Sequence, residues 1–134
     1  MSETPNAADD TAPWPLELRV SPARDSLTVR YEDGTSHAMP SEYLRVLTPS
    51  AERKGHGHPM VLGGKRGVTI SSIHPVGRYA VRIAFSDGHA SGLYTFENLF
   101  ALGASQDDNW RDYEKDLATH GLSRDRPGSA PLRR

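Results

Sequence analysis

Two Asp-Gly pairs, Asp33-Gly34 and Asp87-Gly88, each follow a run in which apolar and polar residues alternate. Such alternation predicts a strand with one buried face. An Asp-Gly pair between two such runs predicts a tight hairpin turn, because both residues tolerate the positive φ that a type I′ turn requires. The chain is therefore expected to contain two β-hairpins.

The two hairpin segments resemble each other beyond the turn. The residues LTVRYEDG at 27–34 parallel VRIAFSDG at 81–88, and a leucine at a helix start, Leu44 or Leu99, follows each of them. We interpret this as a strand-turn-strand-helix unit that occurs twice. Coincidence is the alternative, since Asp-Gly hairpins are common.

Helices are expected after each hairpin and near the C-terminus. A short helix begins at Pro40, and a second begins after Thr95, whose side chain is suited to cap it. Gly103 is expected to end that second helix in the left-handed conformation. A third helix, over 105–120, has one apolar stripe, formed by Trp110, Tyr113 and Leu117.

These patterns predict an α+β fold, a small single domain of two Asp-Gly β-hairpins that form a mainly antiparallel sheet with short helices and a C-terminal helix. Residues 1–13 and 122–134 contain few large apolar side chains, so we expect a disordered tail at each end, the second one basic. Residues 14–103 are expected to form the domain, and residues 104–121 the C-terminal helix.

Composition excludes several classes of function. The formal net charge is -1, which gives no overall attraction to nucleic acid or to anionic membranes. The chain contains no cysteine, so disulfides, thiolate metal sites and cysteine catalysis are excluded. No apolar run reaches the length of a membrane span. We expect a cytoplasmic protein that binds neither nucleic acid nor membrane.

The side chains that carry chemistry do not assemble a catalytic motif. The six histidines include no His-x-Asp or His-x-Glu tripeptide of the kind used by mononuclear iron oxygenases. The glycine-rich stretch at 63–67 lacks the pattern of a phosphate-binding loop. His56 and His58 alternate within a glycine-rich segment and form a weak metal-binding pattern. We therefore expect no catalytic residue and no enzyme activity.

Three blocks of sequence resemble one known family. They are IHPVGRYAVRIAFSDGHASGLYTF at 73–96, LTVRYEDG at 27–34 and LRVLTPSAE at 44–52, and together they resemble the gamma-butyrobetaine hydroxylase-like N-terminal domain family. Members of this family occur as stand-alone bacterial proteins of unknown function, as the N-terminal module of carnitine-pathway oxygenases, and fused to P-loop ATPases that carry iron-sulfur clusters.

The resemblance implies a role for one histidine. In the oxygenases the module has a zinc site of three cysteines and one histidine, and that histidine corresponds to His89. The cysteine region corresponds to residues 48–54, which contain no cysteine here. His89 then has two interpretations: a turn residue that bonds to the backbone or to Asp87, or part of a binding surface with Arg45, Asp87 and Tyr94.

The leading hypothesis is a non-catalytic binding or accessory module without a cofactor. Its expected partner is a protein, with an iron-sulfur carrier P-loop ATPase or a metabolic oxidoreductase implied by the resemblance. The alternative is a metal-binding protein that holds zinc or iron with His89 and the loop residues His56 and His58. A homodimer is left open.

Overall fold

A computed structural model describes residues 13–49 and 61–125, and it confirms the α+β class. The strands are β1 (Pro15–Val20), β2 (Ser26–Tyr31), β3 (Ser36–Pro40), β4 (Ile70–Val76), β5 (Ala80–Phe85) and β6 (Gly92–Thr95). The helices are α1 (Ser41–Val46), α3 (Phe96–Ala104) and α4 (Gln106–Thr119). The strands divide into two antiparallel sheets of three strands, β1-β2-β3 and β4-β5-β6, each in chain order.

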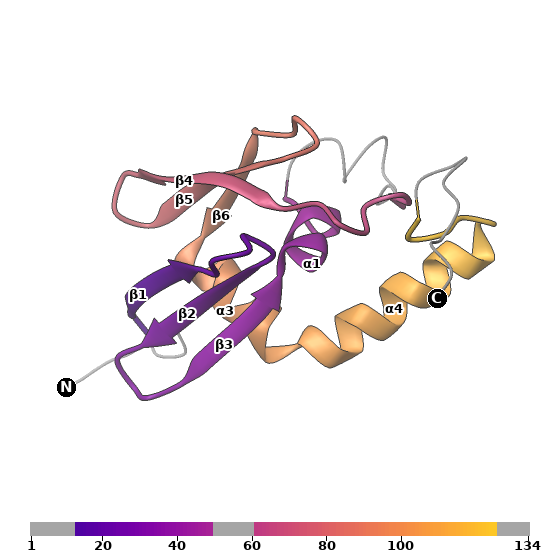
Figure 1. Ribbon diagram of the computed structural model, residues 1–134. Helices are drawn as coiled ribbons and strands as arrows, with labels where there is room; N and C mark the ends of the chain where they lie inside the picture. The colour runs from indigo at the N-terminus through magenta and orange to yellow at the C-terminus, as the bar shows by residue number, and fades with distance from the viewer. Residues whose placement is uncertain (1–12, 50–60, 126–134) are drawn as a thin grey trace.

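One hydrophobic core joins the two sheets. Alternate residues of the two central strands, β2 and β5, point into it, and α1 and α3 contribute Leu44 and Leu99. Figure 1 shows β4-β5-β6 above β1-β2-β3, with α1 beside both and α4 extending away from them. The two hairpins are thus held together by apolar packing rather than by a shared strand ladder.

The two hairpin turns have the same hydrogen bonds. Gly34 N donates to Tyr31 O, and Gly88 N donates to Phe85 O, both at 3.0 Å. Among the described residues that are not glycine, only Arg24 has a positive φ. The predicted type I′ turn is therefore wrong at both sites: only the glycine is left-handed, as in a type I turn that ends in a glycine bulge.

The predicted repeat extends through the whole strand-strand-strand-helix unit. Both first strands have a bulge one pair after their start, between Pro15 and Glu17 and between Ile70 and Ser72. Both following helices begin with a bond to the loop before the central strand. Ser41 N donates to Asp25 O at 2.8 Å, and Phe96 N donates to Tyr79 O at 2.7 Å. The structure therefore confirms two equivalent units, β1-β2-β3-α1 and β4-β5-β6-α3.

The second helix confirms one predicted end and corrects the other. Thr95 Oγ1 accepts a hydrogen bond from Asn98 N, as an N-cap does. Gly103, however, lies inside α3, which continues to Ala104, and its φ is not positive. The physical reason for a glycine here is close packing, because a Cβ at position 103 would lie 2.2 Å from Nδ1 of His37.

Gly103→Ala is expected to lower the free energy of unfolding by about 1–3 kcal/mol, because the added methyl group overlaps the His37 ring. Helix propensity alone would raise stability by about 1 kcal/mol. Urea unfolding of Gly103→Ala measures the net effect. In a His37→Ala background the same change should become neutral or stabilising, and a loss of the same size there would contradict the packing explanation.

The predicted C-terminal helix is present as α4. Tyr113 and Leu117 of its predicted stripe are buried and pack with Val46, while Trp110 is half-buried beside them. Gly121, at φ +67°, ends it. Residues 122–125 of the predicted tail are described and pack on the domain. Residue 13 of the predicted N-terminal tail is also described, whereas residues 1–12 and 126–134 and the loop with His56 and His58 lie outside the described ranges.

Candidate functional site

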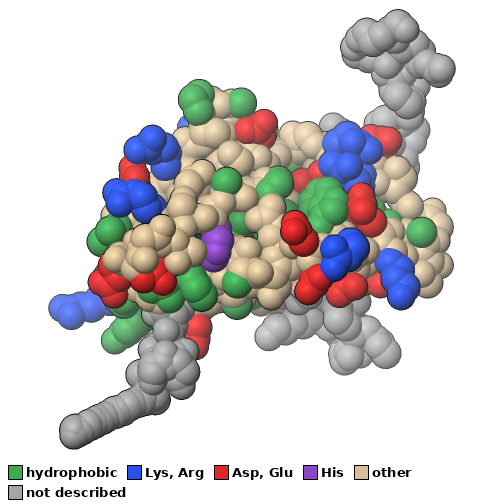
Figure 2. Space-filling view, turned by 90° about the horizontal axis from the view of Figure 1, so that it is seen from below, with side chains coloured by type: hydrophobic (Ala, Val, Ile, Leu, Met, Phe, Trp, Pro, Cys, Tyr) green, Lys and Arg blue, Asp and Glu red, His purple; other side chains and the backbone are tan. Residues whose placement is uncertain are grey.

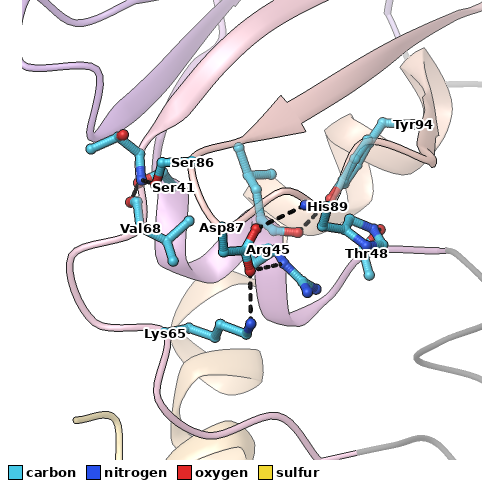
Figure 3. A network of polar contacts seen from close by, with 11 residues as sticks. Ser41, Arg45, Thr48, Lys65, Val68, Ser86, Asp87, His89 and Tyr94 are labelled. Atoms are coloured by element: carbon cyan, nitrogen blue, oxygen red, sulfur yellow. Dashed lines mark hydrogen bonds and ion pairs between the residues drawn. The ribbon is translucent and has the colours of Figure 1, made fainter. Parts of the chain in front are cut away.

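The second hairpin turn forms a charged cluster around Asp87. Arg45 Nε donates to Asp87 Oδ2 at 2.7 Å, and Lys65 Nζ donates to the same oxygen at 2.7 Å. The side chain of Arg45 is only 3% exposed, and that of Asp87 is 18% exposed. Figure 3 shows the two cations approaching Asp87 from α1 and from the loop before β4. One carboxylate oxygen therefore pairs with two cations, the buried Arg45 and the half-buried Lys65.

His89 is held at the same turn by its main chain and by its ring. Its N–H donates to Asp87 Oδ1 at 3.1 Å, and its ring nitrogen Nε2 lies 3.2 Å from Thr48 Oγ1. Thr48 is fully buried just after α1. Gly92 makes room for this contact, since a Cβ there would lie 2.5 Å from Thr48 Oγ1. The imidazole is thus fixed between the turn and the end of α1.

The structure brings three of the four predicted site residues together: Arg45, Asp87 and His89. Tyr94 lies nearby with its ring against Gly92, but its hydroxyl donates to Leu44 O at 2.5 Å and its side chain is buried. Tyr94 is therefore a buried residue that packs beneath the site and is not part of its surface. Within the described ranges, no group of three histidine or acidic side chains could hold a metal ion. His56 and His58 lie outside those ranges.

The first hairpin turn provides an internal comparison. Asp33 Oδ1 accepts from Thr35 N at 2.9 Å, as Asp87 does from His89. Among the described residues, Asp33 has no ion pair such as the one Asp87 makes with Arg45 and Lys65. The same turn thus occurs twice, and only the second copy combines two buried or half-buried cations with a fixed histidine.

The charge environment of Asp87 sets its protonation. Burial by itself raises the pKa of Asp87, but hydrogen bonds from Lys65, the His89 main chain and Arg45, with the charge of Arg45, hold that pKa at about 2. Its ordinary value is 3.8. Ionised Asp87 therefore binds its partners more strongly than protonated Asp87 does.

The lowered pKa of Asp87 predicts that the folded protein loses stability in acid. A carboxyl group whose pKa is lower in the folded state stabilises the fold above about pH 4 and loses that effect as the pH falls toward 2. The stability difference between the wild-type protein and Asp87→Asn should therefore shrink as the pH is lowered from 5 to 2.5. Urea unfolding across this range measures it, and a constant difference would contradict the assigned charge interactions.

The C-terminal segment 122–125 holds the loop that carries Lys65. Gly64 N donates to Ser123 O at 2.8 Å, and Arg66 N donates to Arg124 O at 2.9 Å. The glycine-rich stretch at 63–67, which lacks the pattern of a phosphate-binding loop, is thus fixed by main-chain bonds on both sides of Lys65, and these bonds place Lys65 at Asp87.

The segment is itself attached to a buried carboxylate. Arg124 donates to both oxygens of Glu42 at 2.8 Å, and the Tyr113 hydroxyl donates to Glu42 Oε2 at 2.7 Å. The guanidinium of Arg124 also lies 5.0 Å from the centroid of the Trp110 ring. Hydrogen bonds to Glu42 raise the pKa of Arg124, while burial and the bond to Glu42 raise that of Tyr113.

The fold and this cluster define a class: a small α+β module of two equivalent β-β-β-α units, with a charged site on the second turn. The chain belongs to the family described as gamma-butyrobetaine hydroxylase-like, N-terminal, which matches residues 18–100. This confirms the family resemblance of the three sequence blocks at 27–34, 44–52 and 73–96.

Solved structures agree with this assignment. Two structures determined by NMR in solution are 38% and 34% identical to the chain, each with a TM-score of 0.76. The match with the first structure covers 91% of this chain and 97% of the other chain. The match with the second covers 99% of this chain and 98% of the other chain. A crystal structure of a DUF971 family protein of unknown function from Acidithiobacillus ferrooxidans is 37% identical, with a TM-score of 0.58, and covers 67% and 92%. The search of curated proteins finds no match.

Proposed function

We propose that the protein is a non-catalytic recognition module that acts as an accessory to another protein in the cytoplasm. Its recognition face surrounds the second hairpin turn and consists of Asp87, His89, Arg45 and Lys65. The proposed partner is an iron-sulfur carrier P-loop ATPase, with a metabolic oxidoreductase as the other candidate. Within the part of the chain that is described, no helix is long and apolar enough to cross a membrane.

The difference between the two equivalent turns supports this proposal. Both turns have the same backbone hydrogen bonds, so neither needs additional charges in order to form. At the second turn, nevertheless, three charged groups and a histidine converge from α1, the loop before β4 and the turn itself. A fixed arrangement of charged and aromatic groups gives a surface specificity and orientation toward a partner.

The family resemblance supports the choice of this partner. The resemblance set out above implies members fused to P-loop ATPases that carry iron-sulfur clusters. If a module is fused to an ATPase in some members of a family, a stand-alone member is suited to bind that ATPase as a separate protein.

Isothermal titration calorimetry with the purified iron-sulfur carrier ATPase of the same organism tests the proposal. We expect binding by the wild-type protein and at least tenfold weaker binding by His89→Ala, because the ring contributes to the recognition face. Thr35→Ala is the matched control, since Thr35 occupies the equivalent position of the first turn. No binding, or the same loss in both variants, would overturn the proposal.

The metal-binding alternative makes a different prediction. Nε2 of His89 already contacts Thr48 Oγ1 at 3.2 Å, so a zinc or iron ion on that nitrogen would have to displace a buried hydroxyl group. We therefore expect only background metal in protein purified without chelator. Inductively coupled plasma mass spectrometry measures it. About one equivalent of zinc or iron that disappears in His89→Ala would favour metal binding with His56 or His58.

A further inference from the structure

A second surface of the molecule lies at the outer edge of β3. Tyr31 N donates to Thr35 O at 2.8 Å, and the register pairs Val29 with His37. Because the main-chain groups of an antiparallel strand point alternately to either side, those of Thr35 and His37 face β2. The N–H and C=O groups of Ser36 and Ala38 therefore point away from the sheet, and within the described ranges no hydrogen bond is recorded for them.

Two other sheet edges are protected against strand pairing. β1 begins at a proline and carries the ion pair of Glu17 with Arg19, whose atoms are 2.7 Å apart. The start of β4 is covered by Arg24, whose side chain donates to Ile70 O at 2.7 Å and to Ser71 O at 2.5 Å. β3, with the sequence SHAMP, carries no Asp, Glu, Lys or Arg and has a proline only at its end. Charged residues and covering groups are the usual protection of an edge strand, and β3 has neither.

A groove runs beside this edge, between β3 and the first turns of α4. It consists of two adjoining hollows of about 520 and 360 Å³ that share Gln106 and Asp107. The β3 side supplies Ser36, Ala38 and Pro40, and the far end is formed by Trp110. An edge strand with a helix across a groove is the arrangement in which an extended peptide adds a strand to a sheet.

The charges along the groove favour a basic occupant. Asp107 and Asp108 line the α4 side, and both are exposed. Arg111 lines the same hollow as Asp107, but its ion pair is with Asp108, and among the described residues none forms an ion pair with Asp107. Figure 2 shows this face from below, with acidic and basic side chains interspersed over α4 on the right. A lysine or arginine on a bound peptide would meet Asp107, and an apolar side chain would meet Trp110.

We propose that the groove binds an extended peptide segment of another protein, which pairs with β3 as a fourth strand and places a basic side chain at Asp107. Its main-chain groups bond to the outward N–H and C=O groups of Ser36 and Ala38. This surface is separate from the Asp87 cluster and goes beyond the function proposed above, since the two surfaces can bind different segments or different proteins.

A phage-displayed library of random nonapeptides, selected on the immobilised protein, tests the proposal. Ala38→Pro removes one outward N–H and places a ring at the edge, but leaves the bonds between β2 and β3 intact, because proline is tolerated where the N–H faces away from the sheet. We expect enrichment of peptides with basic and β-branched residues on the wild-type protein only. Circular dichroism checks that Ala38→Pro is folded.

Fluorescence anisotropy with a labelled enriched peptide then measures the contribution of each feature. Ala38→Pro and Asp107→Lys should each weaken binding at least tenfold, whereas Asp112→Lys, an exposed acidic position on the same helix outside the groove, should not. His89→Ala should also leave binding unchanged, which separates this result from the proposed function. No enrichment, equal binding to folded Ala38→Pro, or a dimer of this chain that Ala38→Pro dissociates would overturn the proposal.

Discussion

Asp87→Asn is expected to lower the free energy of unfolding by about 2–4 kcal/mol. Asparagine keeps an oxygen that can accept the His89 N–H, but it removes the negative charge that faces Arg45 and Lys65. Arg45 is 3% exposed, so its charge then lacks this compensation in a largely dry environment. Urea unfolding of the two proteins at neutral pH measures the loss.

Asp33→Asn is the matched control for this prediction. Asp33 occupies the same position in the first turn and accepts the same kind of main-chain hydrogen bond, from Thr35. It is exposed, and among the described residues it has no ion pair like that of Asp87. Its replacement should cost much less stability, and equal losses in the two variants would show that the charges on Arg45 and Lys65 do not matter.

Arg124→Ala is expected to lower the free energy of unfolding by about 2–3 kcal/mol. The change leaves Glu42, whose side chain is 7% exposed, with the Tyr113 hydroxyl and without its bidentate partner. Removing one member of a buried ion pair is strongly destabilising, because the remaining charge stays out of water. The contact with the Trp110 ring is lost as well. Urea unfolding measures the effect.

Two further variants distinguish the effect of leaving the buried charge of Glu42 unpaired from a general effect of removing an arginine. Arg111→Ala removes an arginine that is 69% exposed and paired at the surface of α4, so it should change stability by less than about 1 kcal/mol. Glu42→Gln in the Arg124→Ala background should restore part of the loss, because the amide carries no charge. Similar values for Arg124→Ala and Arg111→Ala would contradict the account.

Much of the fold could be predicted from local sequence patterns. The alternation around the two Asp-Gly pairs identified the hairpins, and the parallel between 27–34 and 81–88 identified the repeat that the hydrogen bonds confirm. The turn type was wrong, because a type I turn with a glycine bulge and a type I′ turn have similar sequences. The prediction that Gly103 ends its helix was wrong. A glycine is required there by close packing against the His37 ring, and no local sequence pattern shows that contact.

The site was predicted only in part. Asp87 and His89 are neighbours in sequence, and Arg45 was named with them. The remaining partners come from far along the chain: Lys65 lies 22 residues from Asp87, Thr48 lies 41 residues from His89, and Arg124 lies 82 residues from Glu42. Contacts over such separations depend on how the elements pack, which local periodicity does not encode.

The repeat also explains how the site can be specialised without changing the fold. Each unit has its own turn, held by bonds within that turn, and both contribute to one core. The second turn draws its additional contacts from Arg45 and Thr48 of the first unit and from Lys65, whereas the first turn makes no such ion pair among the described residues. We infer that the first turn has a structural role and that the second turn adds recognition to the same scaffold.

The most direct test of the central claim is a map of the amides that respond to the partner. The 15N-labelled protein is titrated with the unlabelled iron-sulfur carrier ATPase and followed by heteronuclear NMR. The account predicts that the largest changes fall on Asp87 to Gly92, Arg45 and Thr48, with little change at Asp33 to Thr35. Changes at the two turns of equal size, or no change near Asp87 while the partner binds, would contradict it.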